Sequence, residues 1–145
     1  MVQLSFPIAL VSILASLTSA QESSGFLSNG NCDGNSLRFD DDRNSPWYQY
    51  LSALCKTDEG PKRKSIKLTN CIGDHDGQLA WDTARPNFHL NCDSPCKVVV
   101  DYRSPEEAFL ACSRCKRNKP NTYFTQPQIR LNGGISYNNG ALFCY

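Results

Sequence analysis

The residues best suited to chemistry form the segment Asp74-His75-Asp76, in which a histidine stands between two carboxylates. Such a trio could transfer protons or hold a metal ion. Gly77 follows directly, and Asp-Gly is typical of a tight turn because both residues tolerate positive φ. The second histidine, His89, falls in a segment that we expect to be an alternating strand, on the surface or in the packing. Because neither histidine recurs with a paired acid and base, we expect a turn here and no catalysis.

Two other patterns suggest metal sites but lack the spacing that such sites need. Cys112-x-x-Cys115 is half of a zinc site, and no second pair of suitable spacing completes it. The acidic run at residues 40–42 lacks the spaced ligands of a calcium loop. We therefore expect no metal and no cofactor.

The charge balance argues against nucleic acid as a partner. Fifteen basic and fourteen acidic residues leave a formal net charge of +1, so no large positive field is present. Basic clusters at 62–64 and 114–119 are typical of solvated turns.

The first twenty residues carry no charged side chain and contain a mostly apolar run at 6–17. That run is too short to span a bilayer, which takes about 20 apolar residues. It is typical of a secretory signal cleaved after Ala20, and a buried or anchored N-terminal helix is the alternative. We therefore expect a secreted, extracellular protein without membrane insertion. Its parts would be a signal peptide (1–20), a flexible leader (21–29) and one domain (30–145).

The elements that position these residues come in two copies. Cys32 and Cys55 are 23 residues apart, and so are Cys92 and Cys115. The apolar pattern at 66–79 returns 63 residues later at 129–142. The sequence therefore predicts tandem repeats at about 30–86 and 87–145.

Each repeat is predicted to be β. Residues 65–72 and 128–135 alternate apolar and polar side chains, which is typical of half-buried strands. Asp76-Gly77 and Asn139-Gly140 are hairpin turns by composition. Segments 47–54 and 105–110 fit either a short helical turn or a strand. The fold class is therefore all-β and disulfide-rich.

An even number of cysteines, eight, predicts four disulfides in a secreted chain. Equivalent positions should form equivalent bonds, which pairs Cys32 with Cys55 and Cys92 with Cys115. For the other four cysteines we pair Cys96 with Cys112, across a hairpin around residues 104–105 that needs a bulge. Cys71 and Cys144 then pair by elimination, and other pairings of these four stay open.

The first repeat contains a series of motifs: Cys32, Leu51-Ser52-Ala53-Leu54-Cys55, Ser65-Ile66-Lys67-Leu68-Thr69-Asn70, Asp76-Gly77, Leu79 and Trp81. With these motifs, segment 65–92 strongly resembles the cyanovirin-N homology family, and the resemblance covers nearly all of residues 30–145. The resemblance implies a pseudo-symmetric protein in which each triple-stranded sheet is completed by a hairpin from the other repeat. Family members are lectins for mannose-rich glycans, with one pocket toward each end and no metal or catalysis.

The resemblance implies two glycan-binding pockets. The second-repeat pocket would contain Gly73, Asp74, His75, Asp76, Asn87, Asn91, Lys116, Arg117 and Asn118. The first-repeat pocket would contain Asn31, Lys56, Thr57, Asp58, Glu59, Ser136, Tyr137, Asn138 and Asn139. Short carboxylates and amides with Arg or Lys suit vicinal hydroxyls.

Departures from the family pattern bear on these pockets. Gly73 and Leu90 stand where mannose-binding members carry acids, which weakens the second-repeat pocket. An insertion at 40–50 lengthens the first repeat, and its Trp47 could stack on sugar or pack. Trp81 and Phe88 match core positions of the family.

The sequence therefore predicts a secreted, lectin-like protein that binds mannose-containing glycans without catalysis. Its partners would be glycans or glycoproteins, and it would be a monomer or a hairpin-exchanged dimer. The alternative is a secreted interaction or effector protein that uses the fold without binding sugar.

Overall fold

The computed structural model describes residues 25–41, 48–93 and 95–145, apart from the side chains of Asn29 and Asp41. The predicted signal peptide and Trp47 lie outside the described residues. Within the described segments, no helix is long and apolar enough to cross a membrane.

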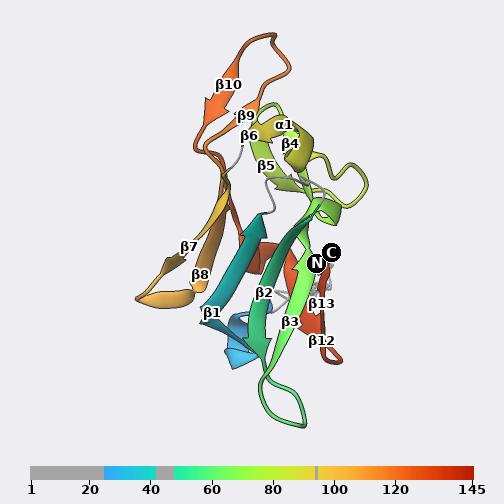
Figure 1. The fold of residues 1–145 in the computed structure, drawn as a ribbon, viewed down its shortest axis with the longest axis vertical. Coiled ribbons are helices and arrows are strands. Elements are labelled where there is room, and N and C mark those ends of the chain that lie inside the picture. The colour runs from blue at the N-terminus through green and yellow to red at the C-terminus, as the bar shows by residue number, and fades with distance from the viewer. Residues whose placement is uncertain (1–24, 42–47, 94) are drawn as a thin grey trace, which may run out of the picture.

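The first repeat forms an antiparallel sheet of β1 (Cys32–Asp41), β2 (Gln49–Cys55) and β3 (Lys62–Lys67), in the order β1-β2-β3 (Figure 1). Leu51 and Ala53 on the central strand are fully buried, and Leu51 lies opposite Ile66. The ambiguous segment 47–54 is therefore a strand from residue 49 onward.

The second repeat builds the matching sheet from β7 (Lys97–Asp101), β8 (Ser104–Ala111) and β11 (Gln128–Arg130), in the order β11-β8-β7. Segment 105–110 is thus a strand as well. The β7–β8 turn lies at 102–103, because Asp101 pairs with Ser104 and its Oδ1 accepts the Arg103 N–H at 2.9 Å. The hairpin turn predicted at 104–105 is therefore placed too late.

Two hairpins complete the sheets. The first joins β4 (Ile72–His75) to β5 (Gln78–Trp81), and the second joins β12 (Ile135–Asn138) to β13 (Ala141–Cys144). Strand β13 packs beside β3, and β5 packs beside β11, so each hairpin covers the sheet of the other repeat (Figure 1). This is the exchange that the resemblance implies.

The strands predicted at 65–72 and 128–135 are each broken in the middle. Three-residue 3₁₀ turns, η2 (Leu68–Asn70) and η3 (Leu131–Gly133), follow β3 and β11. At these turns the chain leaves its own sheet and crosses to the other, with Leu68 and Leu131 fully buried. The sequence alternates apolar and polar residues across the break because side chains before and after it, such as Ile66 and Ile72, both point into the core.

A small sheet of β6 (Cys92–Asp93), β9 (Arg114–Lys116) and β10 (Tyr123–Thr125) lies at one end, in the order β10-β9-β6. The four-residue helix α1 (Phe88–Asn91) precedes it and buries Phe88 and His89. His89 was predicted in a strand, which is wrong, because one helical turn is too short to produce a helical period.

The N-terminal boundary lies earlier than predicted. Phe26 and Leu27 are buried, and the Phe26 N–H donates to the Ile135 carbonyl at 2.9 Å. The 3₁₀ turn η1 (Ser28–Gly30) then leads into β1. Residues 25–29 therefore belong to the packed domain rather than to a flexible leader.

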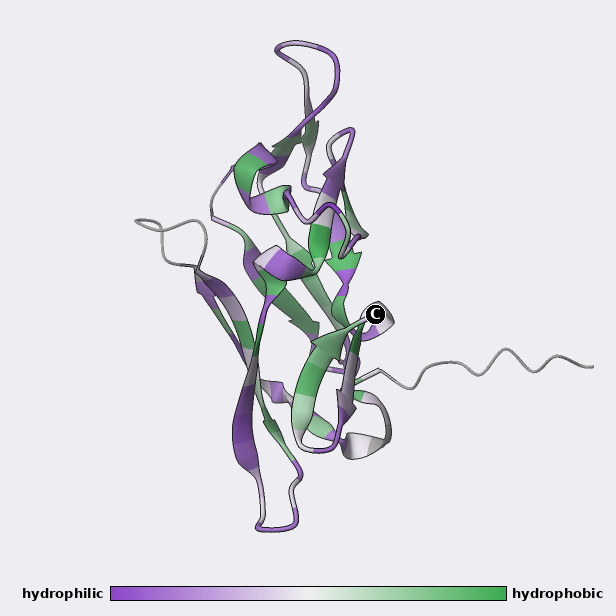
Figure 2. Ribbon diagram, turned by 90° about the vertical axis from the view of Figure 1, so that its right-hand side faces the viewer, coloured by the Kyte–Doolittle hydropathy of each residue, from purple (hydrophilic) through white to green (hydrophobic). Residues whose placement is uncertain are grey.

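Four disulfides join the expected pairs, Cys32–Cys55, Cys92–Cys115, Cys96–Cys112 and Cys71–Cys144. In place of the expected bulge, the second repeat splits into two sheets, with β6 and β9 carrying one bond and the start of β7 and end of β8 flanking the other. Hydrophobic residues follow most of the strands, while one strand and the loops at both ends are largely hydrophilic (Figure 2).

Candidate functional site

The tip of the β4–β5 hairpin is fixed to the β9–β10 loop of the other repeat. Asp76 and Gly77 have φ of 54° and 87°, as the predicted turn requires. Asp76 Oδ1 accepts the Asn118 N–H at 2.8 Å, and Oδ2 accepts from Arg117 Nη2 at 3.2 Å. These bonds, chiefly that from Asn118, hold the pKa of Asp76 below its ordinary value. This carboxylate therefore joins the two repeats.

Asp74 lies half-buried beside the tip. Its N–H donates to Asn87 Oδ1 at 2.7 Å, its Oδ1 accepts the Gly77 N–H at 2.8 Å, and Asn91 hydrogen-bonds the carboxylate. Burial raises the pKa of the Asp74 carboxyl group above its ordinary value. An open, polar pocket of about 380 Å³ is lined by Asp74, His75, Asp76, Arg85, Asn87 and Asn118.

His75 forms a pair with an acid that sequence reasoning missed. Its Nε2 lies 2.9 Å from Asp82 Oδ2, while Asp82 Oδ1 accepts the N–H groups of Ala84 and Arg85. The Arg85 N–H is the main cause that lowers the pKa of Asp82. Arg85, also missed, brings its exposed side chain to the pocket. Asp side chains commonly accept a hydrogen bond from the backbone two or three residues later. This tendency is a sequence signal that could have indicated Asp82 and Arg85.

Five of the nine residues predicted for the second-repeat pocket line it, and four do not: Gly73, Asn91, Lys116 and Arg117. Asn91 and Arg117 act through Asp74 and Asp76. Gly73 is buried, and a Cβ there would lie 2.9 Å from the Arg85 carbonyl oxygen. Packing therefore requires glycine at this position and leaves no room for an acid. Lys116 is exposed on β9, opposite Tyr123.

The opposite end of the molecule repeats this arrangement with different side chains. Asn139 and Gly140 at the β12–β13 tip have φ of 48° and 78°. The Tyr137 hydroxyl donates to the Lys56 carbonyl oxygen, which joins this hairpin to the first repeat. The β2–β3 loop is closed by reciprocal backbone bonds between Thr57 and Gly60. The predicted Lys56 and Tyr137 are thus brought together.

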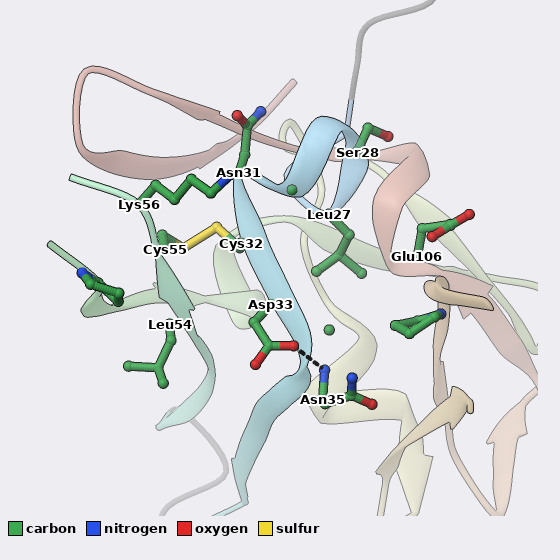
Figure 3. A pocket seen from close by; sticks show the side chains of 14 residues that line it. Leu27, Ser28, Asn31, Cys32, Asp33, Asn35, Leu54, Cys55, Lys56 and Glu106 are labelled. Carbon is green, nitrogen blue, oxygen red and sulfur yellow. Dashed lines mark hydrogen bonds between the residues drawn. A yellow bond between two sulfur atoms is a disulfide. The ribbon is translucent and has the colours of Figure 1, made fainter. Parts of the chain in front are cut away.

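A pocket of about 700 Å³ lies beside this end (Figure 3). Asn31 and Lys56 line it, whereas the other seven predicted residues of the first-repeat pocket do not: Thr57, Asp58, Glu59, Ser136, Tyr137, Asn138 and Asn139. Most of its lining was not predicted: Leu27, Ser28, Gly30, Cys32, Asp33, Gly34, Asn35, Leu54, Cys55, Pro61, Pro105 and Glu106. Residues 105–106 come from the other repeat, so no local sequence pattern could have indicated this pocket.

Three cysteine sulfurs, those of Cys92, Cys112 and Cys115, lie within 4.8 Å of one another. Each belongs to a disulfide, so none offers the thiolate that a metal ion would need.

The geometry of two exchanged hairpins, each seated on the other repeat, matches a known domain. The family model of the CVNH domain matches residues 31–143. The chain belongs to the CVNH family. No curated protein sequence matches it.

Solved structures with the CVNH fold resemble the chain at low sequence identity. The microvirin–mannobiose complex is 24% identical, with a TM-score of 0.59, over 79% of this chain and 94% of that one. The N. crassa CVNH structure is 16% identical, with a TM-score of 0.60, over 80% and 96%. A MoCVNH3 variant in complex with (N-GlcNAc)4 is 14% identical, with a TM-score of 0.53, over 78% and 96%. At these identities the structures show the CVNH fold of this chain.

Proposed function

We propose that this CVNH protein is a lectin that binds mannose-containing glycans without catalysis. The observation that carries the proposal is the polar second-repeat pocket, where groups from both repeats converge on an open space of about 380 Å³. The CVNH structures solved with mannobiose and with a GlcNAc oligomer support sugar as the ligand class.

The pocket chemistry is consistent with hydroxyl recognition. The Asp76 carboxylate accepts hydrogen bonds from Asn118 and Arg117, which hold it in one orientation at the edge of the pocket. The side chains of Arg85 and Asn118 border the pocket and supply donors, and Asp74 supplies a carboxylate acceptor. Charge-assisted bonds from such groups to vicinal hydroxyls favour a sugar over an apolar ligand.

The test is isothermal titration of the oxidised protein with a mannose-rich oligosaccharide. Asn118→Ala removes only the side chain, because Asp76 bonds the backbone N–H of Asn118. We expect this variant, and Arg85→Ala, to bind at least about tenfold more weakly, the loss of one charge-assisted or well-placed hydrogen bond. Lys119→Ala, exposed and outside the pocket lining, is the matched control and should bind normally.

Unchanged affinity in both variants would place the working site elsewhere. Absence of heat with folded protein would overturn the mannose assignment and favour a protein-interaction role.

We also propose that the protein is secreted after cleavage behind Ala20, on the strength of the uncharged apolar N-terminus. Expression of the full chain in a secretory host should release a product that begins at Gln21, as N-terminal sequencing would show. Intact chain retained in the cells would contradict it.

A further inference from the structure

The pocket of about 700 Å³ differs in chemistry from the second-repeat pocket. Its lining includes Leu27, Leu54 and the Cys32–Cys55 disulfide (Figure 3). Pro61 and Pro105 also line it. Leu54 is 36% exposed although it lies on a central strand. The pocket therefore offers an apolar wall, which the second-repeat pocket lacks.

Contact between the repeats forms one side of this pocket. A Cβ at Gly34 on β1 would lie 2.2 Å from the Pro105 carbonyl oxygen on β8. Only glycine allows the two strands to approach so closely, and the approach brings Glu106 to the pocket opposite Lys56 of the first repeat (Figure 3). The space is thus formed jointly by both repeats.

Polar groups stand at the edge of the apolar wall. Asp33 Oδ1 accepts the Asn35 N–H at 2.9 Å, which orients the carboxylate within the lining. The amide side chains of Asn31 and Asn35 also border the space (Figure 3). Carboxylate acceptors and amide donors therefore lie beside leucine methyl groups.

We propose that this inter-repeat pocket binds the acetamido group of an N-acetylated amino sugar, an inference that rests on the proposed lectin function. An acetamido group has a methyl for the exposed Leu54 side chain, an N–H for a carboxylate such as that of Asp33, and a carbonyl for an amide or Lys56. An unmodified hexose carries no methyl and would place hydroxyls against leucine. A free amino sugar has no methyl or carbonyl for these partners, although its cationic amine would be attracted to the carboxylates of Asp33 and Glu106 in the same lining.

The test compares three probes by isothermal titration: a tetramer of N-acetylglucosamine, its de-acetylated counterpart, and a mannose-rich oligosaccharide. We expect the acetylated tetramer to bind about tenfold more tightly than the de-acetylated one, because burial of the methyl contributes roughly a factor of four and one acetamido hydrogen bond supplies the rest. Leu54→Asp should reduce binding of the acetylated tetramer by a further factor of about ten or more. It should leave mannose binding at the second-repeat pocket unchanged.

Val99→Asp is the matched control, because Val99 is an aliphatic strand residue of similar exposure outside this pocket. Circular dichroism and thermal melting of both variants verify that they fold. Tighter binding of the de-acetylated tetramer, or acetylated binding insensitive to Leu54→Asp, would overturn the acetamido assignment while leaving mannose binding intact. If none of the three probes bound, the proposed lectin function would fail together with the inference.

Discussion

The Asp76 carboxylate connects the two repeats and also lines the polar second-repeat pocket. Its two oxygens accept from Asn118 and Arg117, which belong to the other repeat. The groups left to contact a ligand are those whose side chains are not needed for this connection, such as the Asn118 amide. Substitutions in the pocket must therefore be chosen so that structural and binding effects separate.

The protonation of Asp76 should be visible at Asn118. Because the folded state favours the carboxylate, the pKa of Asp76 is lowered from 3.8. Its contribution to stability is present at neutral pH and is lost as the pH falls through this lowered pKa. We expect the Asn118 amide signal in ¹H–¹⁵N spectra to titrate with a midpoint below 3.8.

Asp76→Asn should abolish that titration, which assigns it to this carboxylate. A midpoint at or above the ordinary value in the unmodified protein would show that the two hydrogen bonds do not form in solution.

Alanine substitution at two adjacent glycines should affect stability to very different extents. A Cβ at Gly134 would lie 1.9 Å from Trp81 Cδ2, whereas a Cβ at Gly133 meets nothing nearer than Trp81 Nε1 at 3.9 Å. Gly134→Ala should lower the free energy of unfolding by about 1–3 kcal/mol or more, the cost of overpacking a core. Gly133→Ala should change it little, and urea unfolding of both variants measures the contrast. Equal losses would mean that the indole does not pack over residue 134.

At the scale of elements, the two hairpin tips share a backbone and differ in their surroundings. Both have positive φ at the Asp-Gly or Asn-Gly pair. The first tip is packed against β9 and β10, where a Cβ at Gly77 would lie 2.7 Å from Phe124 Cβ. A Cβ at Gly140 would meet only Lys64 Nζ, at 3.8 Å. The first hairpin is therefore docked more tightly at its tip than the second.

We expect Gly77→Ala to destabilise the protein more than Gly140→Ala. Both pay for a positive φ, about 1–2 kcal/mol for a residue with a Cβ. Gly77→Ala adds a clash that costs about 1–3 kcal/mol where a packed site is overfilled. Chemical unfolding gives both values, and a larger loss for Gly140→Ala would contradict the difference in docking.

At the scale of the whole molecule, three disulfides lie within a repeat and Cys71–Cys144 joins the two hairpins across 73 residues. The bond links Cys71, which directly precedes β4, to Cys144 at the end of β13, so it joins the two hairpins that the repeats exchange. It therefore favours exchange within one chain over exchange between two chains.

Removal of the Cys71–Cys144 bond should destabilise the protein and favour hairpin exchange between two chains. Cys71→Ser with Cys144→Ser should lower the free energy of unfolding by about 4 kcal/mol in the chain-entropy model. We also expect a larger dimer fraction at high concentration by analytical ultracentrifugation. Cys96→Ser with Cys112→Ser, which opens a 16-residue separation within one repeat, should cost about 3 kcal/mol. That control should stay monomeric. Dimers in both variants would show that dimer formation does not depend on loss of the Cys71–Cys144 bond.

Local information was sufficient for much of this protein. Cysteine spacing, the 63-residue recurrence and Asp-Gly or Asn-Gly turns predict two β repeats with their hairpins, because strand period and turn geometry depend on neighbouring residues. The same patterns missed the break at Leu68, since side-chain alternation continues across it. They also missed the start of the domain at Phe26, which is buried and whose N–H bonds the carbonyl of Ile135, 109 positions away in the sequence.

The composition of the pockets was decided by tertiary structure. The resemblance indicated Asp74, Asp76 and Asn118, while the lining of the pocket also contains Arg85 and does not contain Gly73. The larger pocket exists because β1 and β8 meet at Gly34 and Pro105, residues 71 positions apart. Sequence patterns record which residues alternate and turn, whereas a pocket between repeats depends on which distant surfaces come into contact.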